Sequence, residues 1–77
     1  MYGAETTRDG KKIMVVFGYN KKMVAQVKTL SGARFRNEGG EKFWLVNRTA
    51  ANVEKLMDWG FDVTTDLYQM VHPIIVK

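Results

Sequence analysis

Residues 12–17 read Lys-Ile-Met-Val-Val-Phe, a run of apolar and β-branched side chains that predicts a β-strand. Alternate residues of a strand project to opposite sides of a sheet, and both sides are apolar here, with Ile13 and Val15 on one and Met14 on the other. We expect such a strand at the centre of a sheet, either covered on both faces or with one apolar face left open for a partner.

The segments around this strand carry turn and helix signals. Residues 2–7 are expected to form a first strand, joined to the central one by an Asp-Gly turn. Beyond the central strand, Asn20 is a suitable cap for a helix over residues 21–30, where apolar residues recur at helical spacing. Thr49 is placed to cap a second helix over residues 50–59. The expected buried stripe of the second helix consists of Ala50, Val53, Leu56 and Met57.

Between the two helices, the sequence predicts a β-hairpin with strands over residues 33–36 and 42–46 and a glycine-containing turn between them. The alternation leaves open which side of the second strand enters the core. We interpret Phe35 and Trp44 as core residues, since aromatic side chains in strands are usually buried. The alternative is an exposed Phe43 or Trp44 that stacks on unpaired bases.

The C-terminal part predicts a short strand at residues 61–63 and a final edge strand over residues 67–76. A helical turn over residues 67–71 is the alternative, because Pro73 excludes a continuous helix. With these elements, residues 1–77 are expected to form a single α+β domain. Its mostly antiparallel sheet has three to five strands, with two helices packed on one face.

Composition argues against several classes of function. The chain has no cysteine, so it has neither disulfides nor thiolate metal sites, and a single histidine, His72, makes a zinc site or a Ser-His-Asp triad improbable. The glycines match no nucleotide-binding loop. We therefore expect no enzymatic activity, no metal and no cofactor. No apolar run approaches the roughly 20 residues that span a bilayer, and the start lacks a signal peptide, which together predict a soluble protein of the cytoplasm. We also expect a monomer.

Charge is distributed unevenly along the chain. Residues 11–48 carry nine basic and two acidic side chains, whereas residues 49–76 carry one basic and four acidic ones. Such asymmetry either keeps a small domain in solution or provides a surface for an anionic partner. Arginine forms forked hydrogen bonds with phosphate and lysine adds a point charge, so a nucleic-acid backbone suits the basic block. An acidic protein patch or an anionic membrane surface is the alternative partner. The candidate DNA-binding residues are Lys21, Lys22, Lys28, Arg34, Arg36, Lys42 and Arg48.

A series of short motifs extends over residues 12–63. The motifs are Phe17-Gly18-Tyr19, Lys28-Thr29-Leu30-Ser31-Gly32, Arg34-Phe35, Lys42-Phe43-Trp44-Leu45-Val46 and Gly60-Phe61. Their order resembles the HARP-type domain, an accessory module of annealing helicases of the Swi/Snf-type superfamily 2 and of phage and bacterial helicase-like proteins. The series departs from that pattern at Ser31, where proline is common, and at Phe35, where tryptophan is common.

The resemblance implies a module that binds forked or single-stranded DNA for a helicase, in recombination, repair or replication. No motor accompanies the motifs in this chain, so activity that depends on ATP is not implied. A free-standing module would suit a phage accessory protein in the host cytoplasm. The alternative is a protein-interaction module, a phage-type accessory or inhibitor that docks on a helicase or another host protein through the Met14 and Val16 side. A dimer formed through residues 74–76 is a third hypothesis.

Overall fold

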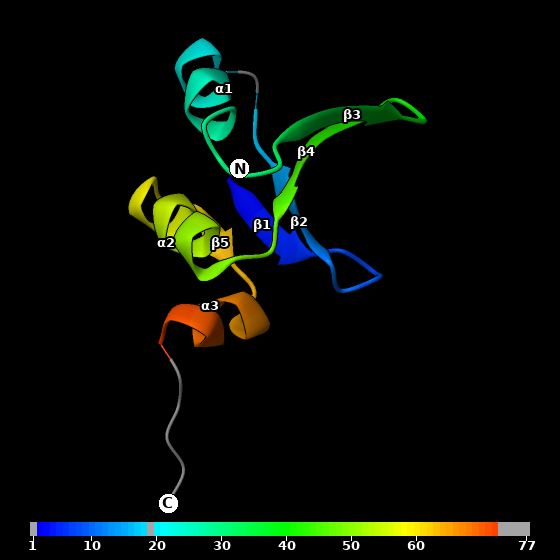
Figure 1. Ribbon diagram of the computed structural model, residues 1–77. Coiled ribbons are helices and arrows are strands. Elements are labelled where there is room, and N and C mark those ends of the chain that lie inside the picture. The colour runs from blue at the N-terminus through cyan, green and yellow to red at the C-terminus, as the bar shows by residue number, and fades with distance from the viewer. Residues whose placement is uncertain (1, 19, 73–77) are drawn as a thin grey trace, which may run out of the picture.

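A computed structural model describes residues 2–18 and 20–72, which form a five-stranded sheet and three helices (Figure 1). In chain order the elements are β1 (Gly3–Thr6), β2 (Lys12–Val16), α1 (Lys21–Val27), β3 (Arg34–Glu38), β4 (Glu41–Asn47), α2 (Ala50–Asp58), β5 (Asp62–Val63) and α3 (Thr65–Val71). The strand order is β3-β4-β2-β1-β5, and every neighbouring pair is antiparallel except β1 and β5. The expected α+β class and mostly antiparallel sheet are therefore confirmed.

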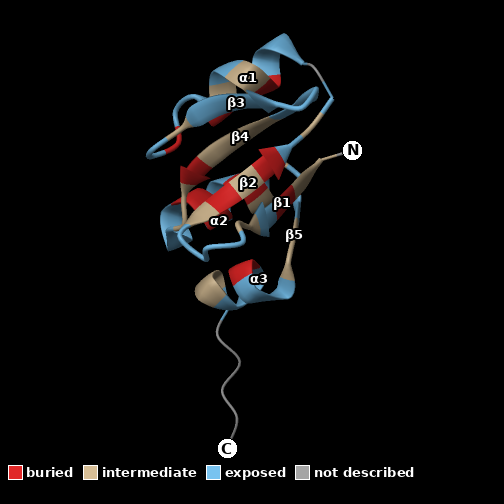
Figure 2. Ribbon diagram, turned by 90° about the vertical axis from the view of Figure 1, so that its right-hand side faces the viewer, coloured by how far each residue is buried: buried red, intermediate tan, exposed pale blue. Residues whose placement is uncertain are grey.

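The first two helices connect strands that are not neighbours in the sheet. Helix α1 joins β2 to β3 across β4, and α2 joins β4 to β5 across β2 and β1. Both helices lie on the same face of the sheet, as predicted (Figure 1). Figure 2 turns the opposite face toward the viewer, and none of the described helices covers it. One face of the sheet therefore builds the core and the other is open.

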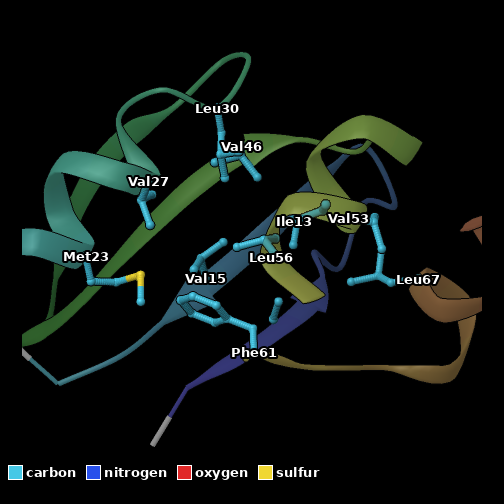
Figure 3. Close-up of a cluster of buried hydrophobic side chains, with 11 residues drawn as sticks. Ile13, Val15, Met23, Val27, Leu30, Val46, Val53, Leu56, Phe61 and Leu67 are labelled. Carbon is cyan, nitrogen blue, oxygen red and sulfur yellow. The ribbon is translucent and has the colours of Figure 1, made fainter. Parts of the chain in front are cut away.

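The core is centred on β2, which confirms the expected central position of this strand. Ile13 and Val15 are fully buried beneath the helices, whereas Met14 is half-buried and Val16 is 39% exposed on the open face. Of the two arrangements that the sequence left open, the structure has the one with a single covered face. The core side chains are Ala4, Ile13, Val15, Met23, Val27, Leu30, Val46, Val53, Leu56, Phe61 and Leu67 (Figure 3).

Helix α1 begins at the predicted cap. The Asn20 side-chain oxygen accepts hydrogen bonds from the backbone N–H groups of Lys22 (3.0 Å) and Met23 (3.2 Å). The helix ends at Val27, three residues earlier than expected, and Leu30 reaches the core from the turn that follows. The strand that follows, β3, lies at the edge of the sheet and is exposed along its whole length.

Helix α2 also begins at the predicted cap, where the Thr49 hydroxyl accepts from the backbone N–H of Asn52 (3.3 Å). Val53 and Leu56 are fully buried, as the stripe predicted. The prediction is wrong for Ala50, which is exposed, and the buried residue one turn before Leu56 on the inner face is Asn52 instead. A polar side chain at a core position was not foreseen from an apolar pattern.

The Asn52 side chain, only 3% exposed, joins three separate segments of the chain. Its amide nitrogen donates to the backbone carbonyls of Asn47 (2.8 Å) and Ser31 (3.1 Å), and its oxygen accepts from the Ser31 N–H (3.3 Å). The end of β4 and the loop after α1 are thereby tied to α2. The next residue of that loop, Gly32, has φ 75°, and a Cβ there would lie 2.5 Å from the Asn47 Cγ, so only glycine fits.

The C-terminal part differs from its prediction, since Thr65–Val71 form helix α3 and not the beginning of an edge strand. Leu67 is fully buried, and Met70 and Val71 pack against the core at the spacing of one helix face. Helix α3 packs against α2 and β1. Residues 73–77, which include the rest of the expected strand and the proposed dimer edge, lie outside the described residues.

Candidate nucleic-acid-binding site

The hairpin of β3 and β4 reaches beyond the rest of the sheet (Figure 1). Its strands pair from Arg34 opposite Leu45 to Glu38 opposite Glu41, and the connection is the two-residue loop Gly39-Gly40. Both glycines have positive φ, 57° and 84°, as a tight loop that follows the twist of the strands requires. The hairpin was predicted, although its turn is shorter than the four residues expected.

Pairing register decides which side of the hairpin each side chain occupies, because residues opposite each other in antiparallel strands project from the same face. Phe35 lies opposite Trp44, and Trp44 lies opposite the buried Val15, so both aromatic residues are on the helix side. Arg34 and Arg36 occupy the alternate positions of β3 and therefore project from the open side. The two arginines and the two aromatic residues are thus separated by the thickness of the sheet.

A cleft of about 470 Å³ lies between α1 and the hairpin. Its walls come from β2, α1, β3 and β4, and we refer to it as the aromatic cleft. The lining residues are Val15, Phe17, Val24, Lys28, Phe35, Lys42, Phe43 and Trp44. Four of these eight residues are aromatic, two are lysines and none is acidic. Phe43 pairs opposite Arg36 and projects from the open side, so the aromatic side chains on the helix side are Phe17, Phe35 and Trp44, and the cleft combines an apolar floor with positive charge.

The aromatic floor depends on the contact between Phe35 and Trp44, whose ring centroids are 5.4 Å apart with an interplanar angle of 57°. Trp44 is half-buried and packs against the core, which agrees with its prediction as scaffold. The prediction that Phe35 is also a core residue is wrong, because this side chain is 51% exposed. Phe35 belongs to an edge strand that the short helix α1 does not cover.

Lys28 and Lys42 are the candidate residues that the structure brings to the aromatic cleft. Lys28 caps the C-terminal end of α1 and Lys42 lies on β4, and both are exposed. Within the described part of the chain, neither lysine forms an ion pair. Residues 10–37 contain seven basic side chains and no acidic one, so the loop, helix and strand around Lys28 contribute no compensating negative charge.

The other candidate residues occupy different surfaces. Lys21 and Lys22 are exposed on the first turn of α1, where Lys22 lines a smaller hollow of about 190 Å³ beside Trp59. Arg36 forms an ion pair with Glu38 on the open side of β3, and Arg34 is exposed on the same side. The seven candidates therefore do not form the single continuous surface that the sequence suggested.

Arg48 directly follows β4, at the end of this strand opposite the Gly39-Gly40 loop, and contacts α3 through Asp66. Its guanidinium group donates to the Thr6 hydroxyl (3.3 Å) and to a carboxylate oxygen of Asp66 (3.5 Å). Hydrogen bonds from Thr6 and Thr64, together with nearby Arg48, lower the pKa of Asp66 to about 2. This cluster joins β1, β4 and α3, and we assign Arg48 to it and not to the cleft.

The open face of the sheet carries a broad, shallow depression of about 780 Å³. Its floor contains Met14, Phe43 and Leu45, and charged side chains of both signs surround it. The charged residues are Glu5, Arg8, Asp9, Lys12, Glu38 and Glu41. Because four of these six side chains are acidic and two are basic, this face suits a polyanion less well than the aromatic cleft does.

The described residues hold neither of two other kinds of functional feature. Within residues 2–18 and 20–72, no three histidine, aspartate or glutamate side chains are grouped closely enough to hold a metal ion. The helices of the same residues are too short and too polar for any of them to cross a membrane.

Fold and cleft together define a small α+β domain whose protruding hairpin and first helix enclose a basic, aromatic site. In comparisons with known proteins, no protein-family model, curated protein or solved structure matches the chain. The resemblance to the HARP-type domain stays a prediction from the sequence motifs. Sequence reasoning missed Phe35 as an exposed aromatic residue, although its position between Arg34 and Arg36 is typical of an edge strand.

Proposed function

We propose that this chain is a non-enzymatic DNA-binding module that recognises forked or single-stranded DNA for a helicase in recombination, repair or replication. The observation that carries the proposal is the aromatic cleft, with Lys28 and Lys42 among its lining residues and no acidic group. Aromatic side chains bind bases by stacking, and lysines neutralise phosphates. Both kinds of contact form with almost any DNA sequence. The motif series that resembles the HARP-type domain supports the link to a helicase.

In this proposal the remaining basic residues contribute from outside the cleft. Lys21 and Lys22 lie on the first turn of α1, outside the cleft, in the part of the chain that has no acidic side chain, and would add positive charge near it. Arg34 and Arg36 are on the same edge strand as Phe35, β3, but project from its opposite face. A DNA strand that passes over this edge could contact both faces. Arg48 is engaged with Asp66 and has no part in the proposal.

Binding of labelled forked and single-stranded oligonucleotides, measured by fluorescence anisotropy at about 50 and about 200 mM salt, tests the proposal. We expect affinity to fall with salt, with a slope in log–log form of about −0.7 for each phosphate contact on a single strand. The double substitution Lys28→Ala and Lys42→Ala should weaken binding by about tenfold, on the order of two lost phosphate contacts. Lys55→Ala, on the exposed side of α2, is the matched control and should change nothing. Absence of binding at the lower salt would refute the proposal.

The second candidate function, a protein-interaction module that docks on a helicase or another host protein, has an observation of its own. The open sheet face exposes Val16 and, beside it, the half-buried Met14 and Leu45, with charges of both signs around them. Val16→Asp should abolish capture of such a partner and leave DNA affinity unchanged. If capture of the protein partner disappears after nuclease treatment, DNA bridges the two proteins and the docking function is contradicted.

A further inference from the structure

We propose that the aromatic cleft binds an unpaired nucleobase of a single DNA strand, stacked on Phe35, with Lys28 and Lys42 on the phosphates at either side of it. This inference rests on the proposed function and specifies which part of the DNA enters the site. It also separates the cleft from the basic residues outside it, which would contact any DNA backbone without regard to pairing.

The size and the lining of the cleft support a base as its occupant. A volume of about 470 Å³ lies within the range of about 300–1,000 Å³ that is usual for small-molecule sites. In a duplex the faces of the bases are hidden within the stack, so a concave aromatic site has nothing to bind there unless a base is extruded. If the ligand were a duplex, exposed lysines alone would suffice to bind its phosphates, and the cleft would have no role.

The geometry of Phe35 and Trp44 supports stacking as the mode of contact. Phe35 exposes half of its surface on an edge strand, where charged side chains are more usual. Its ring is held against Trp44 at a centroid distance of 5.4 Å, and Trp44 in turn packs on the hydrophobic core. The exposed ring is therefore supported from below by rigid structure, which keeps the entropic cost of binding a base low.

The positions of the two lysines support phosphate contacts at either side of the base. Lys28 is at the end of α1 and Lys42 is on β4 opposite Asn37, so each wall of the cleft contributes one cation. A nucleobase is joined to a backbone that carries phosphates in both directions, and this arrangement of one aromatic floor and two cations matches it. An acidic peptide with an aromatic side chain is the competing occupant.

The test compares Phe35→Ala with Tyr68→Ala, a matched control in which a 44% exposed aromatic residue is removed from α3. The ligands are an oligothymidylate of about 12 nucleotides, within the site sizes of single-strand binders, and a duplex of equal length. We expect Phe35→Ala to weaken single-strand binding by about fivefold to a hundredfold and to leave duplex binding within about twofold. Tyr68→Ala should change neither affinity.

A fluorescence measurement keeps the inference testable even if Phe35→Ala fails to fold. In a Trp59→Phe protein, Trp44 is the single tryptophan, and the oligothymidylate should quench it whereas the duplex should not. Equal single-strand affinity of Phe35→Ala and the parent protein, or unquenched Trp44, would overturn the inference and leave the proposed function intact. Tighter binding of an acidic aromatic peptide than of the oligothymidylate would also overturn it. Absence of binding to any oligonucleotide would overturn the inference and the proposed function together.

Discussion

The substitution Asn52→Asp tests the structural role of the buried amide without changing side-chain volume. In the native protein the Asn52 amide nitrogen donates to two backbone carbonyls, at 2.8 Å from Asn47 and 3.1 Å from Ser31. The substitution replaces this donor with an oxygen that faces both carbonyl oxygens. Two hydrogen bonds worth about 1 kcal/mol each are lost, and the new carboxylate is buried where the described hydrogen-bond partners of the side chain are backbone groups and include no basic side chain.

The expected loss of stability is about 3–5 kcal/mol at neutral pH, the usual cost of an uncompensated buried charge. Since a small domain is stable by only about 5–15 kcal/mol, the substitution should remove a large part of the free energy of unfolding. Burial raises the pKa of the introduced carboxyl group above its ordinary value. The electrostatic part of the penalty is therefore complete above the raised pKa and disappears as the pH falls below about 3.9, the ordinary value of aspartate.

Urea unfolding followed by far-ultraviolet circular dichroism, at neutral pH and near pH 4, measures both effects. Asn37→Asp is the matched control, because Asn37 is exposed on β3 and the same chemical change there should cost less than about 0.5 kcal/mol. Asn52→Ala, which removes the donor without adding charge, should fall between the two. Equal unfolding midpoints for Asn52→Asp and Asn37→Asp at neutral pH would refute the assignment of Asn52 as the link between these segments.

Three further predictions concern stability. Gly32→Ala should lower the stability measured by thermal unfolding by about 2–3 kcal/mol, because φ is positive there and the added Cβ would collide with the Asn47 side chain. Gly3→Ala is the control that should be tolerated, since no atom lies within 4 Å of its added Cβ. Leu67→Ala should cost about 2–4 kcal/mol, since this fully buried side chain attaches α3 to the core, and a loss below 1 kcal/mol would contradict that packing. Because the folded state lowers the pKa of Asp66 to about 2, its stabilising contribution is complete above about pH 4 and is lost as the pH falls through about 2. Because the Asp66 side chain is half-exposed, its contribution to the free energy of unfolding stays below about 1 kcal/mol. Asp66→Asn should therefore remove the change of stability with pH between about 4 and about 2 in acid-unfolding measurements.

Much of the fold follows from the sequence, because local signals and tertiary contacts agree there. The apolar run of β2, the caps Asn20 and Thr49 and the paired glycines of the hairpin each predicted an element that the structure contains. The open face of β2 was not predictable, since Met14 is as apolar as Ile13 and only the path of the helices decides which side they cover.

Helix α3 shows a conflict between local signals. Leu67, Met70 and Val71 have helical spacing, but the β-prone residues that follow and Pro73 favoured a strand. The burial of Leu67 against α2 and β1 decides in favour of the helix, and this contact depends on residues far away in the sequence. Tertiary packing of one apolar face outweighs strand propensity in such a short segment.

The candidate site was the least predictable feature, because it depends on strand register. The alternation of side chains along each strand predicted that Arg34 and Arg36 project from one face of their strand. It also predicted that Lys42 and Trp44 project from one face of the other strand. The alternation did not predict the register in which β3 pairs with β4. A shift of this register by one residue would have placed Arg34 and Arg36 on the same face as Lys42. The Gly39-Gly40 loop fixes the register in which Phe35 meets Trp44. A ligand that contacts both basic groups must therefore pass over the edge strand, which a flexible single strand can do far more easily than a stiff duplex.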